Sequence, residues 1–231
     1  MMKNNGDIII YLDMSSANEK KISIIKTVGI LIFNDVEVLD VAGPFEVFSM
    51  TRLDENKRYE TSSPFRVVLL SESKTPVIAI GGLKLTPDFT FDDCPTLDLF
   101  VIPGGWGTRR EVNNLVLLQK ISKLSKKSTL TASVCTGSSL IGKAGLLDGK
   151  KATTHWRTFN FLRDSAPKAQ IQKDVIFTID GTIFTSAGVA SGIRLSLYLV
   201  SHFFGAQVGK ETARFLEFPY PEQSKEKWIN N

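Results

Sequence analysis

Short β-rich runs alternate with helical segments along most of this chain, and this alternation restricts its fold more than any other feature. From about Lys26 onward the pattern predicts strands over Val28–Phe33, Phe65–Ser71, Asp98–Ile102, Thr129–Val134, Ala152–Thr154, Val175–Ile179 and Thr182–Thr185. Between them it predicts helices over Pro44–Leu53, Glu111–Lys126, Thr136–Leu146 and Ser191–Phe204. Strands separated by helices pair in parallel through crossover connections. We therefore expect an α/β fold with a mainly parallel sheet.

One domain of this kind accounts for most of the chain. The 231 residues contain no Pro/Gly/Ser-rich linker, and 42% hydrophobic with 23% charged residues is typical of a globular protein. We expect an N-terminal extension over residues 1–25, a single domain over 26–220 and a polar tail over 221–231. Within the extension, Asp7–Tyr11 is a candidate edge strand.

Composition and charge exclude several classes of function. No apolar stretch approaches the roughly 20 residues that span a bilayer, and no export signal is visible, so we expect neither a membrane partner nor secretion. Two cysteines make no disulfide framework, which predicts a cytoplasmic protein. The net charge of +4 comes from scattered basic residues, so we expect no nucleic-acid partner. Two histidines without HExxH or CxxC predict no metal site.

Residues 137–144 imitate a phosphate-binding loop but do not meet its requirements. The segment matches G-x-x-x-x-G-K, yet Ala144 stands where Ser or Thr must hold magnesium. It also lies largely inside a predicted helix, whereas a phosphate loop lies between a strand and a helix. We reject this motif as a nucleotide site.

Cys135 stands where a nucleophile is expected in such a fold. It follows the predicted strand ending at Val134 and precedes Thr136-Gly137-Ser138-Ser139, small residues that suit a tight strand-to-helix turn. At a helix N-terminus the partial positive charge favours the thiolate, so we expect a lowered thiol pKa. A buried, inert core cysteine is the alternative, and position alone does not decide between them. Cys94 lies in a predicted loop and is expected to have no catalytic role.

Two further segments offer polar groups for the same sheet edge. Gly104-Gly105 ends a neighbouring strand, so its backbone N–H groups, with that of Thr136, could form an oxyanion cradle beside the Cys135 sulfur. An ordinary strand-terminating turn is the alternative. Asp40 is flanked by Leu39 and Val41, which predicts a desolvated carboxyl of raised pKa that can donate a proton. An exposed Asp40 is the alternative, and a helix beginning at Pro44 would leave it without a capping role.

The two histidines are weaker candidates. His155 follows the predicted strand Ala152–Thr154, 20 residues after Cys135, and this places it near the same edge of the sheet. Structural histidines are commoner than catalytic ones, so both roles stay open for His155. His202 is expected to serve packing.

Taken together, these segments resemble the PfpI/ThiJ superfamily of class I glutamine amidotransferase-like proteins. The resemblance covers roughly residues 26–218 and is carried by five segments in order: 39–47 (LDVAGPFEV), 101–105 (VIPGG), 132–137 (ASVCTG), 145–156 (GLLDGKKATTHW) and 186–189 (SAGV). It implies a flavodoxin-like three-layer α/β/α sandwich with a nucleophile elbow at Cys135, usually assembled as a homodimer.

Within the superfamily, the chain is most similar to the isonitrile hydratase branch and to the sensor domains of AraC-type regulators. These branches carry Asp in the L-D-x-x-G-P segment and a Cys-Thr pair at the elbow, so the resemblance implies active-site roles for Asp40, Cys135 and Thr136. The protease branch has His where this chain has Thr136, and neither histidine has the Glu two residues on that amidotransferases need. Regulators carry further DNA-binding helices, so only a free-standing sensor-like domain is expected from that branch.

The resemblance leads to one main hypothesis and two alternatives. In the main hypothesis the protein, without a cofactor, adds water to a small electrophilic isonitrile and yields an N-substituted formamide. Cys135 attacks the carbon, Asp40 supplies the proton, and the amides of Gly105 and Thr136 stabilise the intermediate. Gly104, Trp106 and His155 are candidate pocket residues. The alternatives are a cofactor-independent glyoxalase acting on methylglyoxal and a non-catalytic ligand- or redox-sensing domain.

Overall fold

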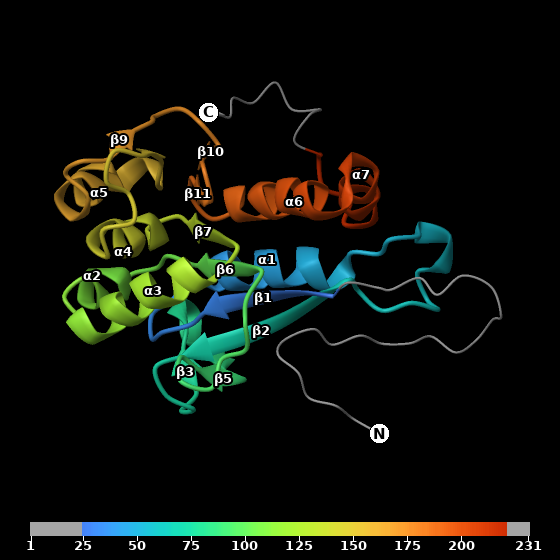
Figure 1. Ribbon diagram of the computed structural model, residues 1–231, viewed down its shortest axis with the longest axis horizontal. Helices are drawn as coiled ribbons and strands as arrows, with labels where there is room; N and C mark the ends of the chain where they lie inside the picture. Colours follow the sequence, from blue (N-terminus) through green and yellow to red (C-terminus); the bar gives the residue numbers. More distant parts are fainter. Residues whose placement is uncertain (1–24, 221–231) are drawn as a thin grey trace.

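A seven-stranded, mainly parallel sheet forms the centre of the molecule (Figure 1). The computed structural model describes residues 25–220. The strands lie in the order β10-β11-β7-β6-β1-β2-β5, and only β10 and β11 pair antiparallel. Their bounds are β1 (Lys26–Leu31), β2 (Phe65–Ser71), β5 (Phe89–Thr90), β6 (Leu99–Ile102), β7 (Leu130–Val134), β10 (Phe177–Asp180) and β11 (Ile183–Ser186). The predicted parallel sheet is confirmed.

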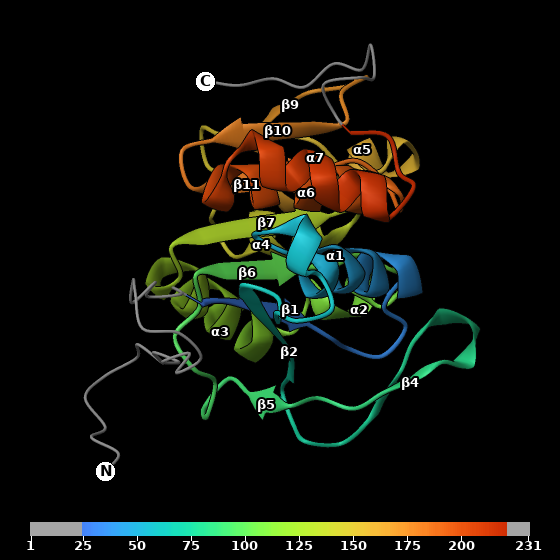
Figure 2. The ribbon, with the colours of Figure 1, turned by 90° about the vertical axis from the view of Figure 1, so that its right-hand side faces the viewer.

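Helices cover both faces of this sheet (Figures 1 and 2). One layer contains α1 (Val38–Met50), α6 (Ser191–Phe204) and α7 (Ala206–Phe215). The other contains α2 (Thr108–Glu111), α3 (Leu115–Lys127), α4 (Gly137–Lys143) and α5 (Phe159–Ser165). All four residues of β6 are buried, as expected of a central strand covered on both sides. The three-layer α/β/α arrangement is confirmed.

Smaller elements lie outside the main sheet. β3 (Val77–Ile78) and β4 (Lys84–Leu85) form an antiparallel pair, and β8 (Lys151–Ala152) pairs in parallel with β9 (Gln170–Ile171). Short 3₁₀ turns are η1 (Glu55–Lys57), η2 (Ile80–Gly82) and η3 (Trp156–Thr158). The strand predicted over Ala152–Thr154 is therefore wrong in extent and place, because only Ala152 lies in β8 and β8 does not join the main sheet.

The first helix begins earlier than the sequence indicated. α1 begins at Val38, six residues before Pro44, and continues through the proline. Pro44 lacks the N–H that would bond the Asp40 carbonyl one turn back. Packing compensates, since Val41, Val47 and Phe48 on this helix are buried in the core. The early start places Asp40 in the first turn, which was not expected.

Two other predicted helices differ in their ends. The helix predicted over Glu111–Lys126 begins later, as α3 at Leu115, and Glu111 instead ends α2. The Asn114 side chain caps α3 by accepting a hydrogen bond from Leu117 N at 3.1 Å. The helix predicted over Thr136–Leu146 is shorter, since α4 ends at Lys143 ahead of Gly145, whose φ is 79°. The ends of Ser191–Phe204 agree with the prediction.

Some sequence-based expectations lie outside the described residues. These are the candidate strand Asp7–Tyr11 and the polar tail over 221–231. Among residues 25–220, no helix combines the length and hydropathy needed to cross a bilayer.

Candidate active site

Cys135 lies in a sharp turn between β7 and α4. Its φ of 56° is in the left-handed region, which non-glycine residues seldom adopt. Its backbone N donates to the carbonyls of Ser186 (3.2 Å) and Ala187 (3.0 Å), so the end of β11 is joined to the turn. The residue is 7% exposed. Strand, strained turn and helix together are the geometry of a nucleophile elbow.

The Asp40 carboxyl lies in the first turn of α1 and is wholly buried. Its Oδ2 accepts a hydrogen bond from Gly104 N at 2.9 Å, while Oδ1 has no partner at standard hydrogen-bond geometry within the described part of the chain. Burial, with a smaller contribution from the charge of Glu37, raises the pKa of Asp40 to about 8. Hydrogen bonding by Gly104 and by the nearby Cys135 thiol lowers this pKa by less. Asp40 is therefore mostly protonated at neutral pH, in agreement with the expected direction.

Gly104 allows three segments to approach one another. A Cβ at this position would lie 2.5 Å from both the N and Oγ1 of Thr136 and 3.0 Å from Asp40 Oδ2. Gly105 N donates to Thr136 Oγ1 at 2.9 Å. The chain segments after β1, β6 and β7 thus meet at one point, at the carboxyl edge of the sheet.

The expected oxyanion cradle is not formed as predicted. The Gly104 amide is bonded to Asp40 and the Gly105 amide to the Thr136 hydroxyl, so neither is open to a substrate oxygen in this structure. The N–H groups that reach the Cys135 sulfur belong to Thr136 and Val189. Val189 was missed as an individual residue, because the segment 186–189 carried only the resemblance.

The expected lowering of the Cys135 pKa is also wrong. Burial, together with the neighbouring Asp40 charge, raises the pKa of the thiol to about 12, against smaller lowering effects of Thr136 and Val189. The short helix α4, of seven residues, does not offset this desolvation. Cys135 is therefore a protonated thiol beside a protonated carboxyl at neutral pH.

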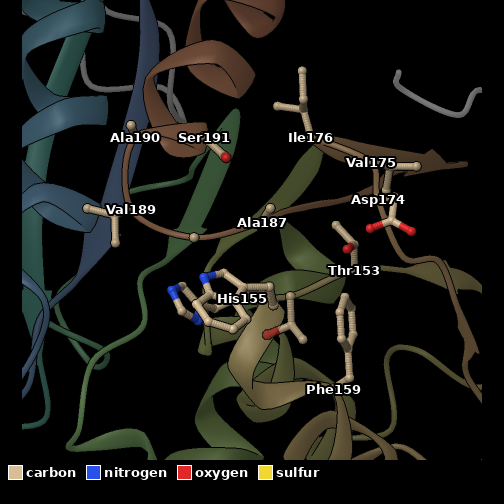
Figure 3. Close-up of a pocket in the computed structure, with 13 residues that line it drawn as sticks. Thr153, His155, Phe159, Asp174, Val175, Ile176, Ala187, Val189, Ala190 and Ser191 are labelled. Carbon is tan, nitrogen blue, oxygen red and sulfur yellow. The ribbon is translucent and has the colours of Figure 1, made fainter. Parts of the chain in front are cut away.

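An open groove lies between the loop after β8 and the loop after β11 (Figure 3), and Cys135 itself is not among its lining residues. Its volume is about 740 Å³, and its lining includes Thr154, His155, Trp156, Phe159, Asp174 and Val189. In Figure 3 the loop through Ala187, Val189 and Ala190 runs above His155. Phe159 lies below and to the right of His155, and Asp174 lies to the right of the loop. Thr154 Oγ1 donates to the Cys135 carbonyl at 2.9 Å, which connects the groove to the elbow.

Of the candidate pocket residues, only His155 lines this groove. Gly104 lies deeper, between Asp40 and Thr136. Trp106 is exposed and is not among the residues that line the groove. His155 was expected at the sheet edge, and it reaches this edge from the loop after β8 rather than from a strand of the main sheet.

The remaining candidates lie elsewhere. Burial and the charge of Asp93 raise the pKa of Cys94 to about 11, and this side chain packs against the core. His202 lies against the rings of Phe184 and Phe203. Within residues 25–220, His, Cys, Asp and Glu side chains form no group of three that could hold a metal ion.

Comparisons with known proteins agree with this geometry. The sequence model of the DJ-1/PfpI family matches residues 26–202. Isonitrile hydratase of Pseudomonas putida is 32% identical over 191 residues, which cover 83% of this chain and 78% of that protein. A THiJ/PfpI family protein from Pseudomonas syringae superimposes with a TM-score of 0.73 at 26% identity, covering 85% of this chain and 77% of that structure.

A transcriptional regulator is also similar. The HTH-type regulator CdhR of Pseudomonas aeruginosa is 31% identical over 149 residues, or 64% of this chain. The matched region is 44% of the regulator's own length.

Proposed function

Because this chain belongs to the DJ-1/PfpI family, we propose that it is a cysteine-dependent isonitrile hydratase. Asp40, Cys135 and Thr136 act at its centre, and the substrate is a small molecule of the form R–N≡C. The similarity to isonitrile hydratase of Pseudomonas putida supports this choice among the activities of the family.

The observation that carries the proposal is the protonated Asp40 carboxyl beside the Cys135 thiol. An isonitrile carbon must receive both a proton and a nucleophile. Asp40, with a pKa of about 8, holds a proton at neutral pH, and the Cys135 thiol lies close enough to its carboxyl to influence that pKa. A thiol of raised pKa is a weak nucleophile alone, so its proton must leave as the new bond forms. Asp40 can therefore supply the proton, and Cys135 can supply the nucleophilic sulfur.

In the first step the Cys135 sulfur bonds to the isonitrile carbon. Asp40 gives its proton to the same carbon, and the thiol proton passes to the Asp40 carboxylate. The product is a thioimidate, R–N=CH–S–Cys135, and Asp40 is protonated again. The N–H groups of Thr136 and Val189 stabilise the negative charge that develops on sulfur.

In the second step water adds to the thioimidate carbon. The water oxygen bonds to carbon, one proton goes to the substrate nitrogen, and the C–S bond breaks as the sulfur recovers a proton. R–NH–CHO leaves, and Cys135 returns to the thiol. The sum is one isonitrile plus one water to one formamide, which needs no redox partner.

The direct test is formamide production from a panel of alkyl and aryl isonitriles. We expect turnover by the wild-type protein, none by Cys135→Ala, and a loss of about 100-fold or more in Asp40→Asn, which cannot donate the proton. The wild-type rate is expected to fall as pH rises through about 8, where Asp40 loses its proton.

Cys94→Ala is the matched control. It replaces the other cysteine, which lies outside the site, and should keep the full rate. Retention of turnover by Cys135→Ala would contradict the cysteine mechanism. Absence of turnover by a folded wild-type protein on every isonitrile would contradict the hydratase itself.

A ligand-sensing role is the second candidate, supported by the similarity to CdhR. A ligand-sensing domain can have the same DJ-1/PfpI fold, and ligand sensing needs no catalytic turnover. Ligand-dependent stabilisation without product formation would favour it. Methylglyoxal belongs in the same panel, since its consumption would favour the glyoxalase alternative. The raised pKa of Cys135 weighs against a redox sensor, because the thiolate is the form that peroxide oxidises.

A further inference from the structure

His155 packs directly on the backbone of Gly188. A Cβ on Gly188 would lie 2.1 Å from His155 Cδ2, closer than any real contact. Gly188 does not have a left-handed φ, so its backbone conformation is open to other residues. Glycine is therefore needed here for space, and the space is occupied by the imidazole.

The next residue, Val189, is held in an unfavourable conformation. Its φ is 45°, which is rare for any residue and especially for a β-branched one. Such strain costs on the order of 1–3 kcal/mol and persists only where the surroundings hold it. Val189 lies close enough to Cys135 for its N–H to lower the pKa of the thiol.

The turn is fixed on its other sides by backbone hydrogen bonds. Cys135 N donates to the Ala187 carbonyl at 3.0 Å, and Ser191 N donates to the Gly188 carbonyl at 3.0 Å. These bonds fix the ends of the loop. The side chain that packs on Gly188 itself is His155.

His155 is in turn held in place and kept uncharged. Its Nδ1 accepts from Arg157 N at 3.2 Å, and its ring stacks on Trp156 with centroids 5.8 Å apart. Burial and the Arg157 charge lower its pKa. No hydrogen bond or ion pair joins its ring to Cys135 or Asp40 in the described structure.

We propose that His155 is a positioning residue, which presses on Gly188 and so holds the Val189 N–H against the Cys135 sulfur. It moves no proton in the reaction. The role rests on the proposed function only in that the sulfur is the nucleophile, because the packing of His155 on Gly188 and the place of Val189 near the sulfur do not depend on the substrate.

The experiment measures the reactivity of the Cys135 sulfur without any isonitrile. In a Cys94→Ala background, the rate of alkylation by iodoacetamide is followed from pH 7 to 10, with the folded state checked by circular dichroism. In His155→Ala we expect alkylation to slow about tenfold at each pH, since a hydrogen bond to the charged sulfur is lost. His155→Phe keeps a ring on Gly188 and should stay within about threefold of wild type.

A double-variant cycle separates packing from other effects. Gly188→Ala should slow alkylation, because its methyl group displaces the turn. In the His155→Ala background the same change should cost nothing more, because the ring that it would strike is gone. His202→Ala, which removes an exposed histidine, is the control and should have no effect.

Equal losses in His155→Phe and His155→Ala would overturn the proposal, since they would make the nitrogen atoms essential. Additive losses in the cycle would also overturn it. If the cycle holds but no isonitrile is hydrated, the positioning role stands and the proposed function fails.

Discussion

At the scale of single residues, Asp40 differs most from an ordinary member of its type. It is wholly buried and receives one backbone hydrogen bond, and no basic side chain among residues 25–220 pairs with it. Its folded-state pKa of about 8 lies far above the usual value of 3.8. The folded state therefore binds the Asp40 proton more tightly than the unfolded state does. Stability from this group is fully present below pH 3.8 and is lost as pH rises to about 8.

Asp40→Asn should accordingly stabilise the fold in a pH-dependent way. We expect no large difference from wild type near pH 4, and a variant more stable by about 5 kcal/mol at pH 8, since the pKa is raised from 3.8 to about 8 and each pKa unit corresponds to roughly 1.4 kcal/mol. Urea unfolding at several pH values measures this. A difference that stays constant between pH 4 and 8 would contradict a buried, protonated carboxyl. The variant would gain stability while losing turnover.

At the scale of elements, the site depends on how closely two turns approach. The turn after β6 and the turn after β7 touch through Gly104 and Thr136, with Asp40 of α1 against both. Because the atoms nearest Gly104 include the backbone N of Thr136, a side-chain rotation cannot make room for a larger residue. The elbow and the acid are thus held together by backbone packing.

Gly104→Ala should separate these elements. We expect a loss of about 1–3 kcal/mol in unfolding free energy from overpacking, together with a loss of nearly all turnover, because Asp40 no longer faces Cys135. Gly209→Ala in α7 is the matched control, since its Cβ would lie 2.0 Å from Ser201 Oγ, away from the site. It should lower stability and keep the rate per folded molecule. Full turnover in Gly104→Ala would show that the close approach is not needed.

At the scale of the whole molecule, the site is assembled from distant parts of one sheet. Residues 40, 104, 135 and 189 follow or flank β1, β6, β7 and β11, which are neighbours in the sheet in the order β11-β7-β6-β1. All four segments leave the carboxyl edge. The seven described strands of the main sheet and both helical layers lie within residues 25–220, so we expect this part to suffice for folding and function.

A chain trimmed to residues 25–220 tests this. We expect its unfolding free energy to match that of the full chain within about 0.5 kcal/mol, the usual range for surface changes, and its turnover to be unchanged. Trimming further to 25–215 removes Tyr220, which is buried and bonded to Ser201 Oγ at 2.7 Å, and should cost about 2–4 kcal/mol. A large loss in the first trimmed chain would place a needed segment outside residues 25–220. Sedimentation equilibrium on both chains tests the proposed homodimer.

The sequence by itself determined the class of fold and the residue types at the site. Runs of apolar residues, the Gly-Gly after Ile102 and the small residues around Cys135 are local features, and local features specify strands, turns and the parallel order of their connections. The raised pKa of Asp40 also followed from its apolar neighbours in sequence.

Only the tertiary structure decided the protonation of Cys135, the start of α1 and the role of Val189. Desolvation sums over atoms from every surrounding segment, so the local helix terminus predicted the wrong direction for the Cys135 pKa. Packing of Val41 and Phe48 in the core carried α1 past the proline that seemed from sequence to begin it. Val189 lies near the sulfur because β11 pairs with β7. His155 contacts Gly188, although the two residues are 33 positions apart in the sequence. Such contacts arise only when the sheet has formed, because they join residues that no local pattern connects.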